Sequence, residues 1–205
     1  MKDVGLIGCG YWGKILLSKL KKLSNLKFVC RSKDNYIHQL NSVKWIFIAT
    51  PNDTHYEIVK TCLASGKNVF CEKPLTLSYK SAKELFGLAE RYNVKLYVDD
   101  VFNYRIERQQ LLLQLEPITE VTVNWESPST DYLYDNLYHD LYLLYPLFSE
   151  TEKLKIMLTP ELQINNIKFS YTYSEQKRHY INGINFTHTD TNNDALTEML
   201  VAVLE

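Results

Sequence analysis

Residues 4–13 read Val-Gly-Leu-Ile-Gly-Cys-Gly-Tyr-Trp-Gly, a short apolar run that ends in three spaced glycines. Gly8, Gly10 and Gly13 form the pattern G-x-G-x-x-G. Such glycines permit a tight turn from strand to helix and let the backbone approach a pyrophosphate, which binds the N–H groups at the start of the helix. The alternative is a tight turn without a ligand.

The residues around the glycines supply the context that a dinucleotide-binding loop needs. A strand-like run precedes them, and apolar residues at helical spacing follow over residues 12–23. We therefore expect Tyr11 and Trp12, which lie between the second and third glycines, to contact the cofactor together with the glycines.

Outward from this loop, the first hundred residues alternate apolar runs with amphipathic runs. Strands are expected at residues 4–7, 26–30, 45–49, 68–71 and 94–98, and helices at 12–23, 56–64 and 78–92. This alternation predicts an α/β domain over residues 1–110, with a parallel sheet of Rossmann type and right-handed crossovers.

Beyond about residue 118 the pattern changes to period two. Strands are expected at residues 121–125, 154–158, 167–173 and 180–186, and helices at 134–148 and 192–204. Residues 111–205 are thus predicted to form a small α+β domain with a mainly antiparallel sheet, covered on one face. The other face would carry the polar positions Thr122, Asn124, Lys168, Ser170 and Thr172.

Composition excludes several classes of protein. The net charge of −1 argues against a dedicated nucleic-acid binder. The longest apolar runs, such as residues 141–148, are far shorter than the ~20 residues of a membrane span. The first residues show no secretory signal and the four cysteines form no C-x-x-C pair, so we expect reduced thiols and a cytoplasmic location.

The end of the second strand indicates which dinucleotide is bound. NAD-binding folds place Asp or Glu there to hold the ribose 2′-OH, whereas this chain has Arg31, Ser32 and Lys33, with the first carboxylate at Asp34. Two cations flanking a hydroxyl suit a 2′-phosphate. The sequence therefore favours NADP over NAD, with solvated loop charges as the alternative.

Two further motifs follow the third and fourth strands. Ala49-Thr50-Pro51-Asn52 with His55 follows one, and Glu72-Lys73-Pro74 follows the other. Together with the glycine loop, their order and spacing resemble the glucose-fructose oxidoreductase, inositol dehydrogenase and MocA (Gfo/Idh/MocA) family over residues 3 to about 105.

The resemblance implies roles for these residues. Lys73 would lie near the reactive nicotinamide carbon and the substrate oxygen, where a cation or proton acceptor assists hydride transfer. Thr50, Pro51, Asn52, His55 and Glu72 would surround the cofactor. The Lys73–Pro74 peptide bond is often cis in relatives.

The family also implies a second catalytic pair, an Asp and a His four residues later on a helix. Asp135 and His139 have this spacing and would share one helix face, although Leu137 replaces the family's usual glycine. Arg105 is a weaker candidate for binding substrate, with an interdomain salt bridge as the alternative. His38, His179 and His188 are interpreted as structural or exposed, and no metal-ligand spacing is found.

Two departures from the family pattern limit the interpretation. Residues 31–44 leave room for one short helix, around residues 36–40, where relatives fit another strand. The second domain is also small, so a homodimer through its sheet is only weakly favoured. The leading hypothesis is an NADP- or NAD-dependent oxidoreductase of sugar-like or polyol-like substrates, in carbohydrate metabolism. The alternatives are a non-catalytic dinucleotide-binding sensor or partner subunit, and a structural protein without cofactor.

Overall fold

The computed structural model describes residues 1–31, 33–114, 121–127, 137–144, 156–158, 162–164, 167–181, 183–186 and 194–205. Its contacts divide the chain into two compact units. Unit 1 comprises Met1–Asp99 and Thr197–Glu205, and unit 2 comprises Asp100–Leu196. The domain division expected after residue 110 stays a prediction.

Unit 1 is built on a parallel sheet of five strands, in the order β2-β1-β3-β4-β5. The strands are β1 (Asp3–Ile7), β2 (Asn25–Cys30), β3 (Trp45–Ile48), β4 (Asn68–Cys71) and β5 (Leu96–Val98). All four residues of β3 are buried, as expected for a central strand covered on both faces. The predicted Rossmann-type sheet is confirmed.

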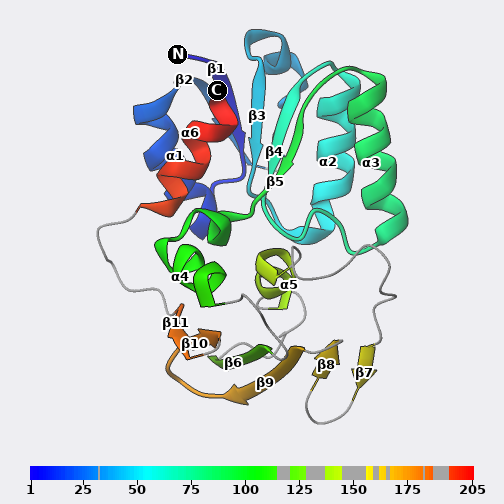
Figure 1. Ribbon diagram of the computed structural model, residues 1–205. Helices are drawn as coiled ribbons and strands as arrows, with labels where there is room; N and C mark the ends of the chain where they lie inside the picture. Colours follow the sequence, from blue (N-terminus) through cyan, green and yellow to red (C-terminus); the bar gives the residue numbers. More distant parts are fainter. Residues whose placement is uncertain are drawn as a thin grey trace. The chain divides into compact units, whose positions relative to one another are not determined.

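Helices cover both faces of this sheet. Figure 1 shows α1 (Tyr11–Leu23) and α6 (Ala195–Leu204) on one face, and α2 (Asn52–Ala64) and α3 (Tyr79–Arg91) on the other. The connections from β1 and β3 therefore run in opposite directions. The carboxyl ends of these two strands form the switch point at which ligands bind in open α/β sheets.

Two local features differ from simple periodicity. α2 begins at Asn52, four residues before the predicted start, because Pro51 fixes φ at −58° and Asp53 in the first turn favours the positive end of the helix. Between residues 33 and 44 the chain forms the 3₁₀ helix η1 (Ile37–Ser42) and no strand, as the short connection predicted. β2 is consequently the edge of the sheet.

Unit 2 contains a six-stranded sheet in the order β11-β10-β6-β9-β8-β7. The strands are β6 (Val121–Ser127), β7 (Ile156–Leu158), β8 (Leu162–Ile164), β9 (Ile167–Tyr173), β10 (Arg178–Ile181) and β11 (Ile184–Asn185). β6 and β9 are parallel, and the other neighbouring pairs are antiparallel. The mainly antiparallel sheet is confirmed.

The two faces of this sheet alternate as predicted. Val123, Trp125 and Phe169 are buried, whereas Thr122 and Asn124 are exposed. The strand expected over residues 180–186 is instead a hairpin, because Gly183 adopts a φ of +79° between β10 and β11.

The helices of unit 2 were only partly anticipated. α5 (Tyr138–Leu144) falls within the predicted helix, whereas η2 (Val101–Tyr104) and α4 (Ile106–Gln114) follow the first sheet without a clear periodic signal. None of the helices in the described parts of the chain is long and apolar enough to cross a membrane.

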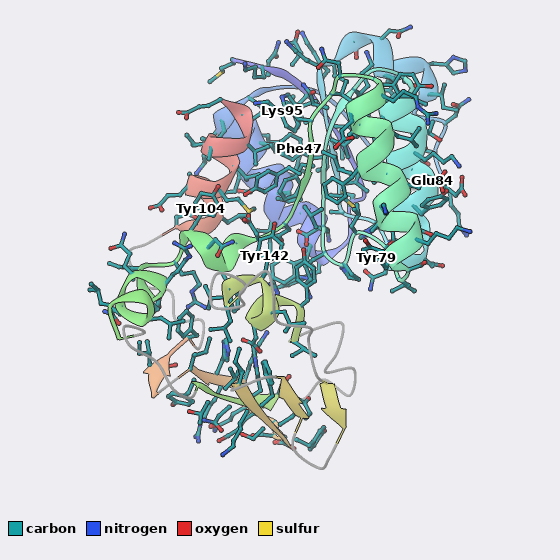
Figure 2. The ribbon with its side chains drawn as sticks, turned by 45° about the vertical axis from the view of Figure 1, so that its right-hand side comes forward. Phe47, Tyr79, Glu84, Lys95, Tyr104 and Tyr142 are labelled. Atoms are coloured by element: carbon teal, nitrogen blue, oxygen red, sulfur yellow. The ribbon has the colours of Figure 1, made fainter. Side chains whose placement is uncertain are left out.

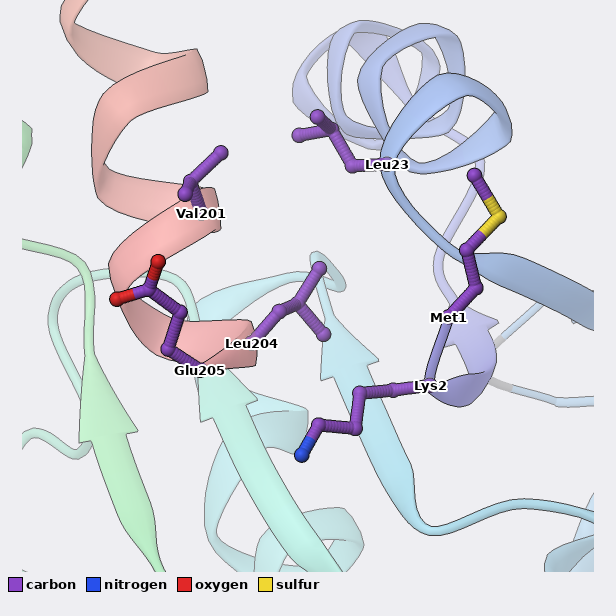
Figure 3. Close-up of a pocket in the computed structure, with 6 residues that line it drawn as sticks. All are labelled: Met1, Lys2, Leu23, Val201, Leu204 and Glu205. Carbon is purple, nitrogen blue, oxygen red and sulfur yellow. The ribbon is translucent and has the colours of Figure 1, made fainter.

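Side chains in unit 1 separate into a core and a solvated surface. Phe47 of β3 lies within the sheet, and Glu84 of α3 points outward, where it forms an ion pair with Lys60 at 3.0 Å (Figure 2). An apolar hollow of about 300 Å³ is lined by Leu23, Val201 and Leu204, whose side chains are drawn in Figure 3. Because Met1 and Lys2 border it, this hollow lies at the amino end of β1, away from the glycine loop.

Candidate functional site

The three glycines at the carboxyl end of β1 fit the geometry of a phosphate-binding turn. Gly8 has a φ of +107°, and a Cβ there would collide with the Ala49 carbonyl at the end of β3. A Cβ on Gly13 would collide with the carbonyl oxygen of Gly8. A Cβ on the exposed Gly10, by contrast, would meet open space. Gly8 and Gly13 thus close the turn, and Gly10 leaves room for a ligand to approach the backbone.

The start of α1 is available to an anion. Gly10 caps the helix without a side chain, and its carbonyl accepts the first helical hydrogen bond from the Lys14 N–H at 3.0 Å. The N–H groups of a first helical turn have no intrahelical partners. Tyr11 and Trp12 project beside them with 76% and 56% of their surface exposed, and their rings meet edge to face at 5.3 Å.

His55 joins two of the predicted motifs. Its imidazole is fully buried, with Nδ1 2.8 Å from the Pro74 carbonyl oxygen and Nε2 2.9 Å from that of Thr50. The turn after β3 is therefore tied to the segment after β4. Pro51 and Asn52 remain exposed at the start of α2. The predicted contact of His55 with a cofactor stays a prediction, and its observed contacts are with the protein backbone.

A buried pair of carboxyl groups lies at the ends of β4 and β5. Glu72 and Asp99 are 8% and 6% exposed, and their carboxyl groups are close enough to interact electrostatically. The Asp99 N–H donates to the Cys71 carbonyl at 2.9 Å, which aligns the two segments. Lys73 follows Glu72, is half-buried, and precedes Pro74 through a cis peptide bond.

Glu72→Gln is expected to change how stability depends on pH. Burial, followed by the neighbouring Asp99 carboxyl, raises the pKa of Glu72 well above its ordinary value of 4.5. A carboxyl whose pKa is raised by folding favours the folded state below its unfolded pKa and loses this contribution as pH rises through its folded pKa. Above pH 4.5 the free energy of unfolding should therefore fall more steeply in the wild type than in Glu72→Gln.

Urea unfolding at a series of pH values measures this difference, and parallel curves for the two proteins would contradict it. Glu90→Gln, an exposed change of the same chemistry on α3, is the matched control and should keep the wild-type slope.

The segment after β2 carries both positively and negatively charged side chains. Arg31 and Lys33 are exposed, and Ser32 lies outside the described residues. Asp34 is also exposed, and its Oδ2 accepts a hydrogen bond from the Arg31 backbone N–H at 2.6 Å. A carboxylate is thus folded back to the end of β2, where the sequence alone placed two cations and a hydroxyl.

In unit 2, His139 lies on α5 and is half-buried. Its ring stacks on Phe102 of η2, with centroids 4.3 Å apart and planes at 12°. Asp135, its predicted partner, lies outside the described residues. Leu137 is 7% exposed and belongs to the hydrophobic core of the unit, which accounts for a large residue in place of the family glycine.

Arg105 is engaged within unit 2. It donates from Nη1 to the Phe186 carbonyl oxygen at 2.6 Å and forms an ion pair with Glu107 at 3.3 Å, with 11% of its side chain exposed. Its predicted role in binding substrate stays a prediction, and the observed salt bridge joins two residues of the same unit.

Comparisons with known proteins agree with this geometry. Residues 14–100 match the model of the Gfo/Idh/MocA family, described as an oxidoreductase family with an NAD-binding Rossmann fold. These residues resemble the Gfo/Idh/MocA family in sequence.

An uncharacterized oxidoreductase of Streptococcus pneumoniae serotype 4 is 28% identical over 123 residues. The match covers 51% of this chain and 33% of that protein, so the matched region spans about a third of the curated relative.

Solved structures share the fold. The WlbA (WbpB) dehydrogenase of Thermus thermophilus, crystallised with NAD and UDP-GlcNAcA, has a TM-score of 0.77 at 16% identity, over 100% of this chain and 88% of that one. UDP-N-acetylglucosamine 3-dehydrogenase GnnA of Acidithiobacillus ferrooxidans has a TM-score of 0.75 at 18% identity, over 99% and 87%. At such identities the likeness concerns the fold alone.

The Gfo/Idh/MocA resemblance gave no indication of a buried polar cluster in unit 2. Asp140 is fully buried, with Oδ1 2.7 Å from His179 Nε2, and its Oδ2 accepts a hydrogen bond from Trp125 Nε1 at 2.6 Å. Burial raises the pKa of Asp140, and His179 acts in the opposite direction. The sequence did contain an indication of this cluster. His179 lies on the same buried face of β10 as Ile181, and a buried polar side chain requires a hydrogen-bonding partner.

The buried cysteines and the remaining candidate metal ligands are less suited to nucleophilic catalysis or metal binding. Burial raises the pKa of Cys62 to about 12 and that of Cys30 to about 11, so neither thiol is a nucleophile at neutral pH. Among the described residues no cluster of His, Cys, Asp or Glu could hold a metal ion, and His38 is exposed. His188 lies outside the described residues.

Proposed function

We propose that this chain binds a nicotinamide dinucleotide, NADP in preference to NAD, and transfers a hydride between it and a sugar, nucleotide-sugar or polyol-like substrate. The observation that carries the proposal is the glycine turn, in which Gly8 and Gly13 are sterically obligatory and Gly10 faces open space beside the start of α1. A turn without a ligand has no need of the middle glycine.

Two further residues would carry the proton transfer of this reaction. When bound, the nicotinamide accepts or returns the hydride of the substrate carbinol carbon. Lys73 would place its ammonium or amine beside the substrate oxygen and take up its proton during oxidation, and His139 would assist that transfer. Reduction reverses both proton movements. The names of the structural relatives support a sugar-like substrate, since one is a UDP-N-acetylglucosamine dehydrogenase.

A second candidate is a non-catalytic sensor or partner subunit that binds the dinucleotide. The short connection between β2 and β3 favours it, because β2 is left as the sheet edge beside the adenine half of the predicted site. A homodimer through the sheet of unit 2 is also part of the proposal, although the exposed Thr122, Asn124 and Lys168 make that face too polar for a core-like interface.

Cofactor titration followed by a substrate screen separates these candidates. NADPH and NADH are titrated by their fluorescence, and oxidised cofactors are then mixed with sugars, polyols and nucleotide sugars while nicotinamide absorbance is recorded. Turnover supports the oxidoreductase. Tight binding without turnover of any of them favours the sensor, and absence of binding overturns both.

Arg31→Ala is expected to separate the two cofactors. A charge-assisted hydrogen bond to the 2′-phosphate contributes about 1.5–3 kcal/mol, so the dissociation constant for NADPH should rise about 10- to 100-fold while that for NADH stays within about twofold. Asp34→Asn is the paired variant, because the Asp34 carboxylate at the end of β2 is the group that could hold a ribose 2′-OH. Tighter binding of NADH by the wild type, lost in Asp34→Asn and unaffected by Arg31→Ala, would establish NAD as the cofactor.

A further inference from the structure

Unit 2 contains a ladder of four aromatic rings, formed by His139, Phe102, His179 and Trp125. His139 and Phe102 are stacked at 4.3 Å, Phe102 and His179 lie 5.8 Å apart with planes at 30°, and His179 and Trp125 are stacked at 3.8 Å. The rings come from four separate elements, α5, η2, β10 and β6.

The Trp125 end of the ladder is linked back to His139 through Asp140. His179 pairs with Asp140, whose other carboxylate oxygen accepts from the Trp125 indole N–H. Asp140 directly follows His139 on α5. The four rings and the Asp140 carboxylate therefore form a closed series of contacts, called here the circuit. The side chain of His139 is held by its stack on Phe102, and the backbone of α5 is held by the contacts of Asp140.

Each member of the circuit is itself fixed. Asp140 and His179 are 0% and 1% exposed, and Trp125 is 2% exposed. Phe102 is held by the 3₁₀ turn of η2, in which the Asn103 side chain donates to the Asp100 carboxylate at 3.0 Å and the Asn103 N–H donates to the Asp100 carbonyl at 2.8 Å. A half-buried imidazole has two rotatable side-chain torsions, and a nearly parallel stack on an anchored ring restricts both.

We propose that Phe102, His179 and Asp140 are positioning residues that hold the His139 imidazole in one orientation. Their use in the reaction rests on the proposed function, in which His139 assists proton transfer. Geometry of this kind matters to rate, because a displacement of about 1 Å at a reacting group can cost about 10²-fold.

A first experiment reads the orientation of His139 in the cofactor-free protein. Stacking on Phe102 shifts the ring protons of His139 upfield, and His139→Ala assigns their resonance by its disappearance. We expect this resonance to move downfield in Phe102→Leu, to return in Phe102→Trp, and to move or broaden in His179→Gln and Asp140→Asn.

Phe169→Leu is the matched control, since Phe169 is a 2% exposed ring of the same core that lies outside the ladder. It should leave the His139 resonance in place. Circular dichroism verifies that each variant is folded, and Phe102→Leu is the mildest test because Phe102 is only half-buried. An unshifted wild-type resonance, or an equal change in Phe102→Leu and Phe169→Leu, would overturn the proposal.

A second experiment connects the ladder to turnover. Phe102→Leu should lower kcat about 10- to 100-fold with little change in KM, and should have no further effect on kcat in the His139→Ala background. Additive losses in this double-mutant cycle would show that Phe102 acts independently of His139. If no substrate is turned over, the proposed function fails, whereas the resonance of His139 still decides whether the ladder holds its ring.

Discussion

Lys73→Met should lower kcat about 10²- to 10⁴-fold while leaving the dissociation constant for the dinucleotide within about threefold. A positioned proton-transfer group contributes a factor of this size, and Met keeps the length and packing of the aliphatic stem. Lys73 is half-buried and directly follows Glu72 in the segment after β4. Steady-state turnover together with NADPH titration measures the two quantities separately.

The matched control is Lys95→Met, a change of the same chemistry on the segment before β5, which should leave kcat unchanged. Equal turnover by Lys73→Met and the wild type would remove Lys73 from the chemistry. A loss of dinucleotide binding in place of turnover would indicate that Lys73 holds the cofactor instead.

His179→Leu should destabilise unit 2 by about 3–5 kcal/mol, because it leaves the buried Asp140 carboxylate without its charged or donating partner. The indole N–H of Trp125 still donates to Asp140, but one hydrogen bond does not replace the lost ring. Urea unfolding followed by Trp125 fluorescence, in a chain whose Trp12 and Trp45 are Phe, reports the stability of this unit.

The double variant Asp140→Asn/His179→Leu tests the cause. Asn removes the buried charge and still offers a carbonyl oxygen to Trp125, so about half or more of the lost stability should return. Equal destabilisation by His179→Leu alone and by the double variant would assign the loss to packing of the imidazole ring rather than to the unpaired carboxylate.

Much of unit 1 could be predicted because local sequence and tertiary structure agree there. The alternation of buried strands and amphipathic helices sets the topology, and Gly8 and Gly13 mark positions where a Cβ would collide with backbone. The short connection after β2 also predicted that no further strand forms before β3. The exception was the start of α2, where Pro51 and the polar first turn begin the helix earlier than apolar spacing indicates.

Unit 2 was less predictable because its contacts are non-local. The parallel pairing of β6 with β9 joins residues 46 positions apart, and period-two patterning does not distinguish parallel from antiparallel neighbours. Asp140 lies on helix α5, whereas its partners Trp125 and His179 lie on the two strands β6 and β10. The sequence left two interpretations of Arg105, substrate binding and an interdomain salt bridge. Its contacts with Phe186 and Glu107 depend on the fold.

The proposed dinucleotide site is tested most directly by titrating the wild type and Gly10→Val with NADPH. A Cβ at Gly10 meets no protein atom within 4 Å, so Gly10→Val should fold like the wild type, but its side chain would occupy the space that a pyrophosphate needs. We predict saturable binding by the wild type and at least about a 100-fold weaker affinity in Gly10→Val, equivalent to about 2.7 kcal/mol. Binding that is absent from the wild type, or equal in the two proteins, would contradict a dinucleotide site at this turn.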